Sequence, residues 1–220
     1  MKVRDRLGLS KRRQGQLVRA MQVGMVLVLV AGLLQGKFGI VVNSSVGLAV
    51  TFVPALLRRD ARLTMDVGLV LWITTAMFLH ALGVLTLPGT SSAYRSVWWW
   101  DHVTHALSSS LVAAVGYATA RALSTADDDL VLPPRFMFVY LLVFVMAFGV
   151  VWELVEFLTS VLAQVAGSQD VLTQYGLGDT MLDLMYNTLG GLLVAVWGTA
   201  YLTDVSGQLA DRLTTRRAAE

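Results

Sequence analysis

Three short segments of the chain carry carboxylates and histidines at spacings of three or four residues. The groups are Asp101, His102 and His105; Glu153 and Glu156; and Asp179, Asp183 and Asn187. Side chains three or four residues apart lie on the same face of an α-helix. Each segment therefore predicts a polar stripe along one helix.

A cluster of carboxylates with one to three histidines suits a divalent metal such as zinc, manganese or magnesium. Such an ion lowers the pKa of a bound water and can create a hydroxide nucleophile. The sequence has no cysteine, which excludes thiolate ligands, disulfides and a cysteine nucleophile.

These residue types predict three roles. The predicted metal ligands are Asp101, His105, Glu153, Glu156, Asp179 and Asp183. The predicted catalytic groups are His105, Glu153, Glu156 and Asp183. Three further residues, Asn187, His80 and His102, are predicted to orient the ligands by hydrogen bonding to them without binding the metal.

The helices that carry these groups are predicted to cross a membrane. Only 15% of the residues are charged and 55% are hydrophobic, whereas a soluble domain has about 25% charged residues. Mean hydropathy is +0.63. Because about 20 apolar residues cross about 30 Å of hydrocarbon, six segments qualify as spans, namely 20–36, 38–57, 67–87, 101–120, 136–166 and 179–203.

None of these segments alternates apolar and polar residues as the strands of a membrane barrel do. The sequence therefore predicts an all-α, polytopic membrane protein with six transmembrane helices in one bundle. Residues 1–19 are predicted to form a basic cytoplasmic tail, 20–204 the transmembrane domain, and 205–220 a second cytoplasmic tail.

The basic residues predict the orientation of the spans. In this topology 15 of the 17 lysines and arginines lie on the side of the two termini, and only Lys37 and Arg95 lie on the other. Positive residues are retained on the cytoplasmic side. We therefore predict a multi-pass protein of the plasma membrane with both termini in the cytoplasm. Its basic tail is interpreted as a contact for anionic lipids, not for nucleic acid.

This topology brings the three polar stripes to one level, near the outer leaflet. His80, late in the third span, reaches the same level. Asp101 and Asp179 also begin their spans, where an acid caps a helix and favours its dipole. Capping does not explain Glu153 or Asp183, and acids inside a membrane span mark functional sites by default.

The segments 101–105, 152–157 and 178–187, with Gly190 after them, resemble the YjdF-like family of small prokaryotic inner-membrane proteins. More distantly they resemble the VanZ-like family. Both families pair an Asp-x-x-x-His helix start with a downstream Glu and a final Asp-x-x-x-Asn/Asp helix before small residues. The resemblance covers about 100 residues, in spans four to six. It implies a role in the cell envelope and leaves open whether His102 or His105 is the equivalent histidine.

Three functions are consistent with the sequence, which leaves open whether the protein is an enzyme. The leading hypothesis is a metal-dependent hydrolase or transferase acting on a lipid or lipid-linked substrate near the outer leaflet. The alternatives are a transporter or ion or proton pathway through the same carboxylates, and a non-catalytic membrane scaffold. The inner segments 111–115, 139–150 and 192–196 offer almost no polar lining, which favours a pocket open on one side. The expected partners are membrane lipids and a lipid-linked substrate, without nucleic acid; the oligomeric state is left open.

The orientation predicts that residue 168 is outside the cell and residue 124 inside. In intact cells, a cysteine introduced by Ser168→Cys should react with an impermeant maleimide, whereas Ser124→Cys should react only after lysis. Because the chain has no native cysteine, every label reports the introduced thiol. The reverse pattern would overturn the predicted orientation.

Overall fold

The computed structural model describes residues 10–168, 172 and 175–217, and all regular secondary structure in these residues is helical. The helices are α2 (Lys11–Leu34), α3 (Phe38–Asp60), α4 (Val67–Val84), α5 (Ala93–Ser96), α6 (Trp100–Ala126), α7 (Pro134–Ala166) and α8 (Leu177–Arg217). The prediction of an all-α membrane fold is confirmed.

Local sequence signals determine where several of these helices begin and end. The side chain of Ser10 accepts a hydrogen bond from the backbone N–H of Arg13 at the start of α2. Asp66 caps α4 in the same way, accepting from the backbone N–H of Gly68 at 2.8 Å. Such caps satisfy N–H groups that have no partner within the helix. At the end of α7, Gly167 has φ +62°, a left-handed conformation that glycine adopts without steric cost.

Five helices in the described part of the chain are long and apolar enough to cross a membrane: α2, α3, α4, α7 and the first part of α8, Leu177–Gly198. Helix α6 has 27 residues, which is also long enough. It is less apolar because it carries the polar residues of the first stripe and three consecutive serines. The count of six spans, like the division into membrane domain and tails, stays a prediction.

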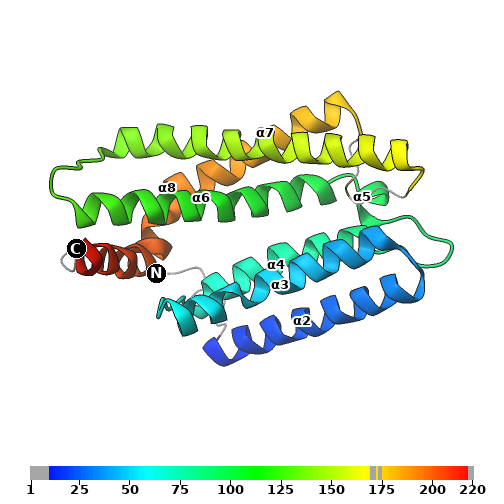
Figure 1. Cartoon of the computed structure of the whole chain (residues 1–220), viewed down its shortest axis with the longest axis horizontal. Helices are drawn as coiled ribbons and strands as arrows, with labels where there is room; N and C mark the ends of the chain where they lie inside the picture. Colours follow the sequence, from blue (N-terminus) through cyan, green and yellow to red (C-terminus); the bar gives the residue numbers. More distant parts are fainter. Residues whose placement is uncertain (1–9, 169–171, 173–174, 218–220) are drawn as a thin grey trace.

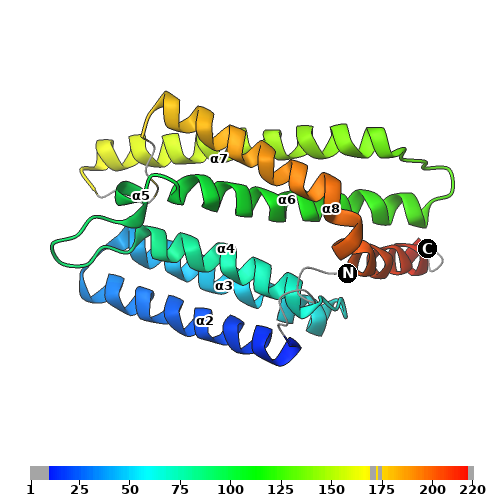
Figure 2. The same ribbon diagram turned by 180° about the vertical axis from the view of Figure 1, so that it is seen from behind.

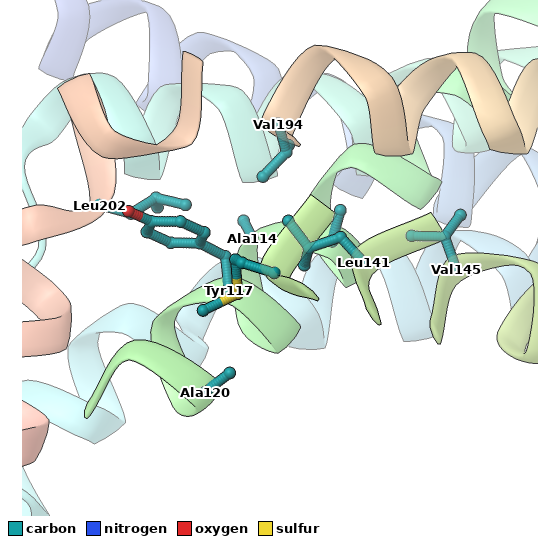
Figure 3. Packing of buried hydrophobic residues seen from close by; sticks show 9 residues of the cluster. Ala114, Tyr117, Ala120, Leu141, Val145, Val194 and Leu202 are labelled. Carbon is teal, nitrogen blue, oxygen red and sulfur yellow. The ribbon is translucent and has the colours of Figure 1, made fainter. Parts of the chain in front are cut away.

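The helices form two groups of three, each with its own apolar core (Figures 1 and 2). Helices α2, α3 and α4 enclose Met25, Val28, Ile40 and Ala81. Helices α6, α7 and α8 enclose the second core, whose members are Ala113, Ala114, Tyr117, Ala120, Met137, Leu141, Val145, Val194 and Leu202 (Figure 3). Trp72 of α4 packs against this second core and so joins the two groups.

Helices α6 and α8 approach each other closely at Gly190. A Cβ atom on this glycine would lie 2.1 Å from Ser109 Oγ and 2.3 Å from the backbone oxygen of Ala106. Real Cβ atoms do not come this close to backbone atoms, so the contact requires glycine. Small residues allow membrane helices to pack backbone against backbone, and this contact fixes how α8 lies on α6.

Beyond residue 200 or so, where α8 turns from orange to red, the helix leaves its first direction and lies at the end of the molecule away from α5 (Figures 1 and 2). Leu202, Ser206 and Ala210 are buried at successive turns of this last part. Gln208 joins it to the α3–α4 connection through hydrogen bonds with Thr64. The last part of α8 is therefore packed against the rest of the protein.

The contact at Gly190 predicts that Gly190→Ala separates α6 from α8. Overpacking of this kind costs about 1–3 kcal/mol of stability, so the unfolding midpoint in detergent should fall. The matched control is Gly207→Ala in the same helix, where a Cβ would have nothing within 4 Å and where alanine favours the helix by about 1 kcal/mol. Equal midpoints for the two variants would show that the close contact is absent.

Candidate metal centre

The imidazole of His105 is the central group of the polar cluster. It lies one turn after Asp101 on α6, with Nε2 at 3.4 Å from Asp101 Oδ1. Its other nitrogen, Nδ1, is 3.3 Å from Asn187 Oδ1 of α8. The residue is 6% exposed. His105 is therefore held between two helices, with Nε2 directed at carboxylates and Nδ1 at an amide oxygen.

Helix α8 brings Asp183 to the same imidazole. Asp183 Oδ1 lies 3.8 Å from His105 Nε2 and 4.0 Å from His102 Nδ1. These distances exceed those of hydrogen bonds. The ring of His102 stacks on Tyr186, with centroids 4.4 Å apart and planes 1° from parallel. Asp183 and Asn187 precede the close contact at Gly190 on α8, which explains how they reach α6.

Helix α7 completes the cluster with Glu153 and Glu156. Ligand atoms of His105, Glu153 and Glu156 lie within 4.8 Å of one another, and so do those of Asp101, His105 and Asp183. His105 belongs to both groups. Both groups are close enough to hold a metal ion, so five residues from three helices, predicted as ligands from sequence, come together.

The cluster contains buried carboxylates without compensating partners. Glu153 is 5% exposed and Asp183 is 1% exposed. Thr180 interacts with Glu153, but among the described residues neither oxygen of Glu153 or Asp183 has a hydrogen bond of normal geometry. Nor does any described lysine or arginine pair with the acids of the two groups within 4 Å. Because an unpaired buried charge costs several kcal/mol, the site favours a bound cation or protons.

Asp179 lies outside both groups. Its Oδ2 accepts a hydrogen bond from the backbone N–H of Tyr175 at 3.1 Å, at the beginning of α8. Tyr175 precedes α8, so Asp179 holds the segment that leads into the helix and lies in the first turn, where an acid favours the helix dipole.

His80 also lies outside the two groups, in a separate polar network. Its Nε2 is 2.7 Å from Ser108 Oγ of α6, and its Nδ1 is 2.7 Å from the hydroxyl of Tyr94 in α5. That hydroxyl in turn donates to Thr104 Oγ1 at 3.4 Å. Burial raises the pKa of Tyr94, so the phenol stays protonated. The network joins α4 and α5 to Thr104 of α6, which is next to His105 in the chain.

Three side chains that contact the site or its neighbours were not predicted from the sequence. Trp152 donates from Nε1 to Glu156 Oε1 at 3.1 Å, Tyr186 stacks on His102, and Tyr94 bonds to His80. Trp152 and Tyr186 lie four and three residues from a cluster acid, so helical spacing could have found both. Tyr94 lies in a short helix far from the stripes in sequence, and no spacing rule points to it.

Comparison with known proteins agrees with the fold. An uncharacterised protein of Thermotoga maritima is 31% identical over 121 residues, which cover 54% of this chain and 56% of that protein. No solved structure matches the chain. A family model described as "Predicted membrane protein (DUF2238)" matches residues 17–204, and the YjdF-like resemblance is consistent with it. The chain therefore belongs to the DUF2238 family of predicted membrane proteins.

Proposed function

We propose that the cluster of Asp101, His105, Glu153, Glu156 and Asp183 binds a divalent cation, with His105 as the shared ligand. The observation that carries this proposal is the burial of Glu153 and Asp183 around one imidazole, without hydrogen bonds of normal geometry and without a described lysine or arginine partner. A cation would neutralise the mutual repulsion of these acids. One nitrogen ligand among several carboxylate oxygens suits zinc or manganese better than magnesium, which prefers oxygen alone.

We further propose that the bound ion serves an enzyme, a hydrolase or transferase, and does not pass through the protein. Beyond the cluster, α6, α7 and α8 are closed by the second apolar core, which includes Tyr117, Leu141 and Val145 (Figure 3). An ion pathway needs polar groups across the whole membrane. The site has them at one end only, the end predicted to lie in the outer leaflet.

The surroundings of the cluster support one class of substrate. Trp152 is 42% exposed and donates to Glu156, and its neighbours Val151 and Val155 are also exposed. In a membrane protein, such an apolar surface faces lipid. Glu156 therefore lies beside the bilayer, which supports a lipid or lipid-linked substrate.

In such a reaction the bound ion, Asn187 and Glu156 would have different roles. A bound ion would supply a water of lowered pKa. Asn187 fixes the ring of His105 through Nδ1 and leaves Nε2 for the carboxylate side, as outer partners of metal-binding histidines do. Glu156, held by the Trp152 indole, is placed to accept or return a proton at the lipid side. A scaffold that only pairs helices would need bases opposite these acids.

A bound cation should stabilise the fold. A ligand that binds only the folded state contributes about 2.7 kcal/mol at a hundredfold excess over its dissociation constant. Chelator should therefore lower the unfolding midpoint of the wild type in detergent and have much less effect on the double variant Glu156→Gln, Asp183→Asn. Elemental analysis should find metal in the wild type and a large loss in Glu153→Gln.

The matched control is Asp179→Asn, which removes an acid one turn from Asp183 but outside both groups. This variant should keep both the metal and the response to chelator. If the double variant is more stable than the wild type and chelator changes neither, the acids are not metal ligands and are held protonated instead.

The enzymatic function predicts chemistry on lipids in a closed vesicle. Protein reconstituted with phosphatidylglycerol, phosphatidylethanolamine and a polyprenyl diphosphate should produce a new lipid or released headgroup by mass spectrometry. Production should require the metal and disappear with Glu153→Gln. Uptake of the metal into the vesicles with unchanged lipids would instead establish the transporter.

A further inference from the structure

A second polar site lies at the opposite end of the bundle, independent of the carboxylate cluster. The last part of α8 and the α3–α4 connection border an open pocket of about 230 Å³ at the surface. Its lining residues are Arg62, Gln208, Asp211, Arg212 and Thr215. Figure 1 shows this end of α8, in red, at the end of the molecule away from α5.

The two walls of the pocket are fastened to each other. Gln208 Oε1 accepts from the backbone N–H of Thr64 at 2.7 Å and from its hydroxyl at 3.0 Å. Gln208 Nε2 donates back to the Thr64 backbone oxygen at 3.0 Å. Leu63, next in the chain, is 8% exposed. The arginines on either side are therefore carried by backbone that the protein holds in place.

Arg62 occupies an unusual backbone conformation. Its φ is +44°, and no other non-glycine residue in the described part of the chain has a positive φ. The bend is fixed by the backbone N–H of Leu63, which donates to the Leu57 oxygen at 3.0 Å. Side chains other than glycine adopt this conformation at a steric cost. A left-handed residue with this hydrogen bond is a common way for a helix such as α3 to end, so the conformation fixes where the Arg62 side chain leaves the backbone.

The charges of the pocket are not balanced internally. Its lining includes two arginines, Arg62 and Arg212, and one acid, Asp211. Neither arginine forms an ion pair with a described acid within 4 Å, whereas the nearby Arg59 is paired with Asp60 at 2.6 Å. The net charge of one positive unit suits a singly charged anion.

We propose that this pocket binds a phosphate group, as the phosphodiester of an anionic lipid headgroup. Arginine pairs with phosphate through two parallel N–H donors, which lysine cannot do. Arg62 lies two residues beyond the candidate span α3, and the last part of α8 follows the candidate span Leu177–Gly198, so we expect the pocket to lie near the lipid phosphates of one leaflet. Basic pockets at the cytoplasmic ends of membrane helices bind such headgroups. A free phosphate ion has the same chemistry, so the test separates the two sources.

The test measures how the unfolding midpoint of the purified full chain in neutral detergent changes with added ligand. The probes are dioctanoyl phosphatidylglycerol, dioctanoyl phosphatidylcholine and inorganic phosphate. For the wild type we expect a saturable rise with phosphatidylglycerol, and little change with phosphatidylcholine or with inorganic phosphate at the same concentration.

The variants separate binding from folding. Arg62→Gly relieves the positive φ, so the protein without ligand should be no less stable than the wild type. Yet the half-saturating concentration of phosphatidylglycerol should rise about tenfold or more, because a charged hydrogen bond is lost. Arg212→Gln should weaken binding similarly, and Asp211→Asn should strengthen it. The control Arg135→Gln removes an exposed arginine at the start of α7, outside the pocket, and should change nothing.

Two results would overturn the proposal. If Arg62→Gly and Arg212→Gln respond to phosphatidylglycerol as the wild type does, the pocket is not the site of binding. If phosphatidylcholine raises the midpoint equally, the effect comes from the acyl chains. A rise that inorganic phosphate alone reproduces, and that both arginine variants lose, would support the phosphate pocket but assign it to a soluble anion instead of a lipid.

Discussion

The close contact between α6 and α8 at Gly190 is the constraint on which the site depends. In lipid, helices gain little from burying apolar surface against each other, so close packing and polar contacts must hold them. Without a side chain at Gly190, the α8 backbone lies directly on Ala106 and Ser109. That approach brings Asp183 and Asn187 to His105. A larger residue at position 190 would move Asp183 and Asn187 of α8 away from His105 of α6, although every ligand residue would still be present.

The contact at Gly190 also sets two opposing effects against each other in the cluster, helix packing and the repulsion between carboxylates. Packing draws the three helices together, whereas the carboxylates of Asp101, Glu153 and Asp183 repel each other in a site that excludes most water. The bundle can satisfy both demands only if something neutralises the acids. If a bound cation does so, its binding and the folding of α6, α7 and α8 are coupled, because a ligand that cancels the repulsion stabilises the packed arrangement.

The sequence predicted the class of fold and the convergence of the stripes because both follow from simple periodicities. Hydropathy indicates which helices are apolar enough to cross a membrane, and spacing gives the face of a helix on which a side chain lies. Spacing does not give the rotation of one helix relative to another. For that reason Asp179 and Asp183, one turn apart, could not be told apart, although only Asp183 reaches His105. His80 reached the predicted level but bonds to Tyr94 and Ser108, which no periodicity connects.

The division into two helix groups explains why α6 can be so polar. Protein covers it on several sides: α7 and α8 pack on it in one group, and α4 approaches it from the other. A helix shielded in this way need not be apolar to lie in a membrane, since its polar groups face other protein. Helices α2, α3 and α4 support α6 as a group, with α4 packing beside it. Through Trp72 and the His80–Ser108 contact they hold α6 in place beside α7 and α8.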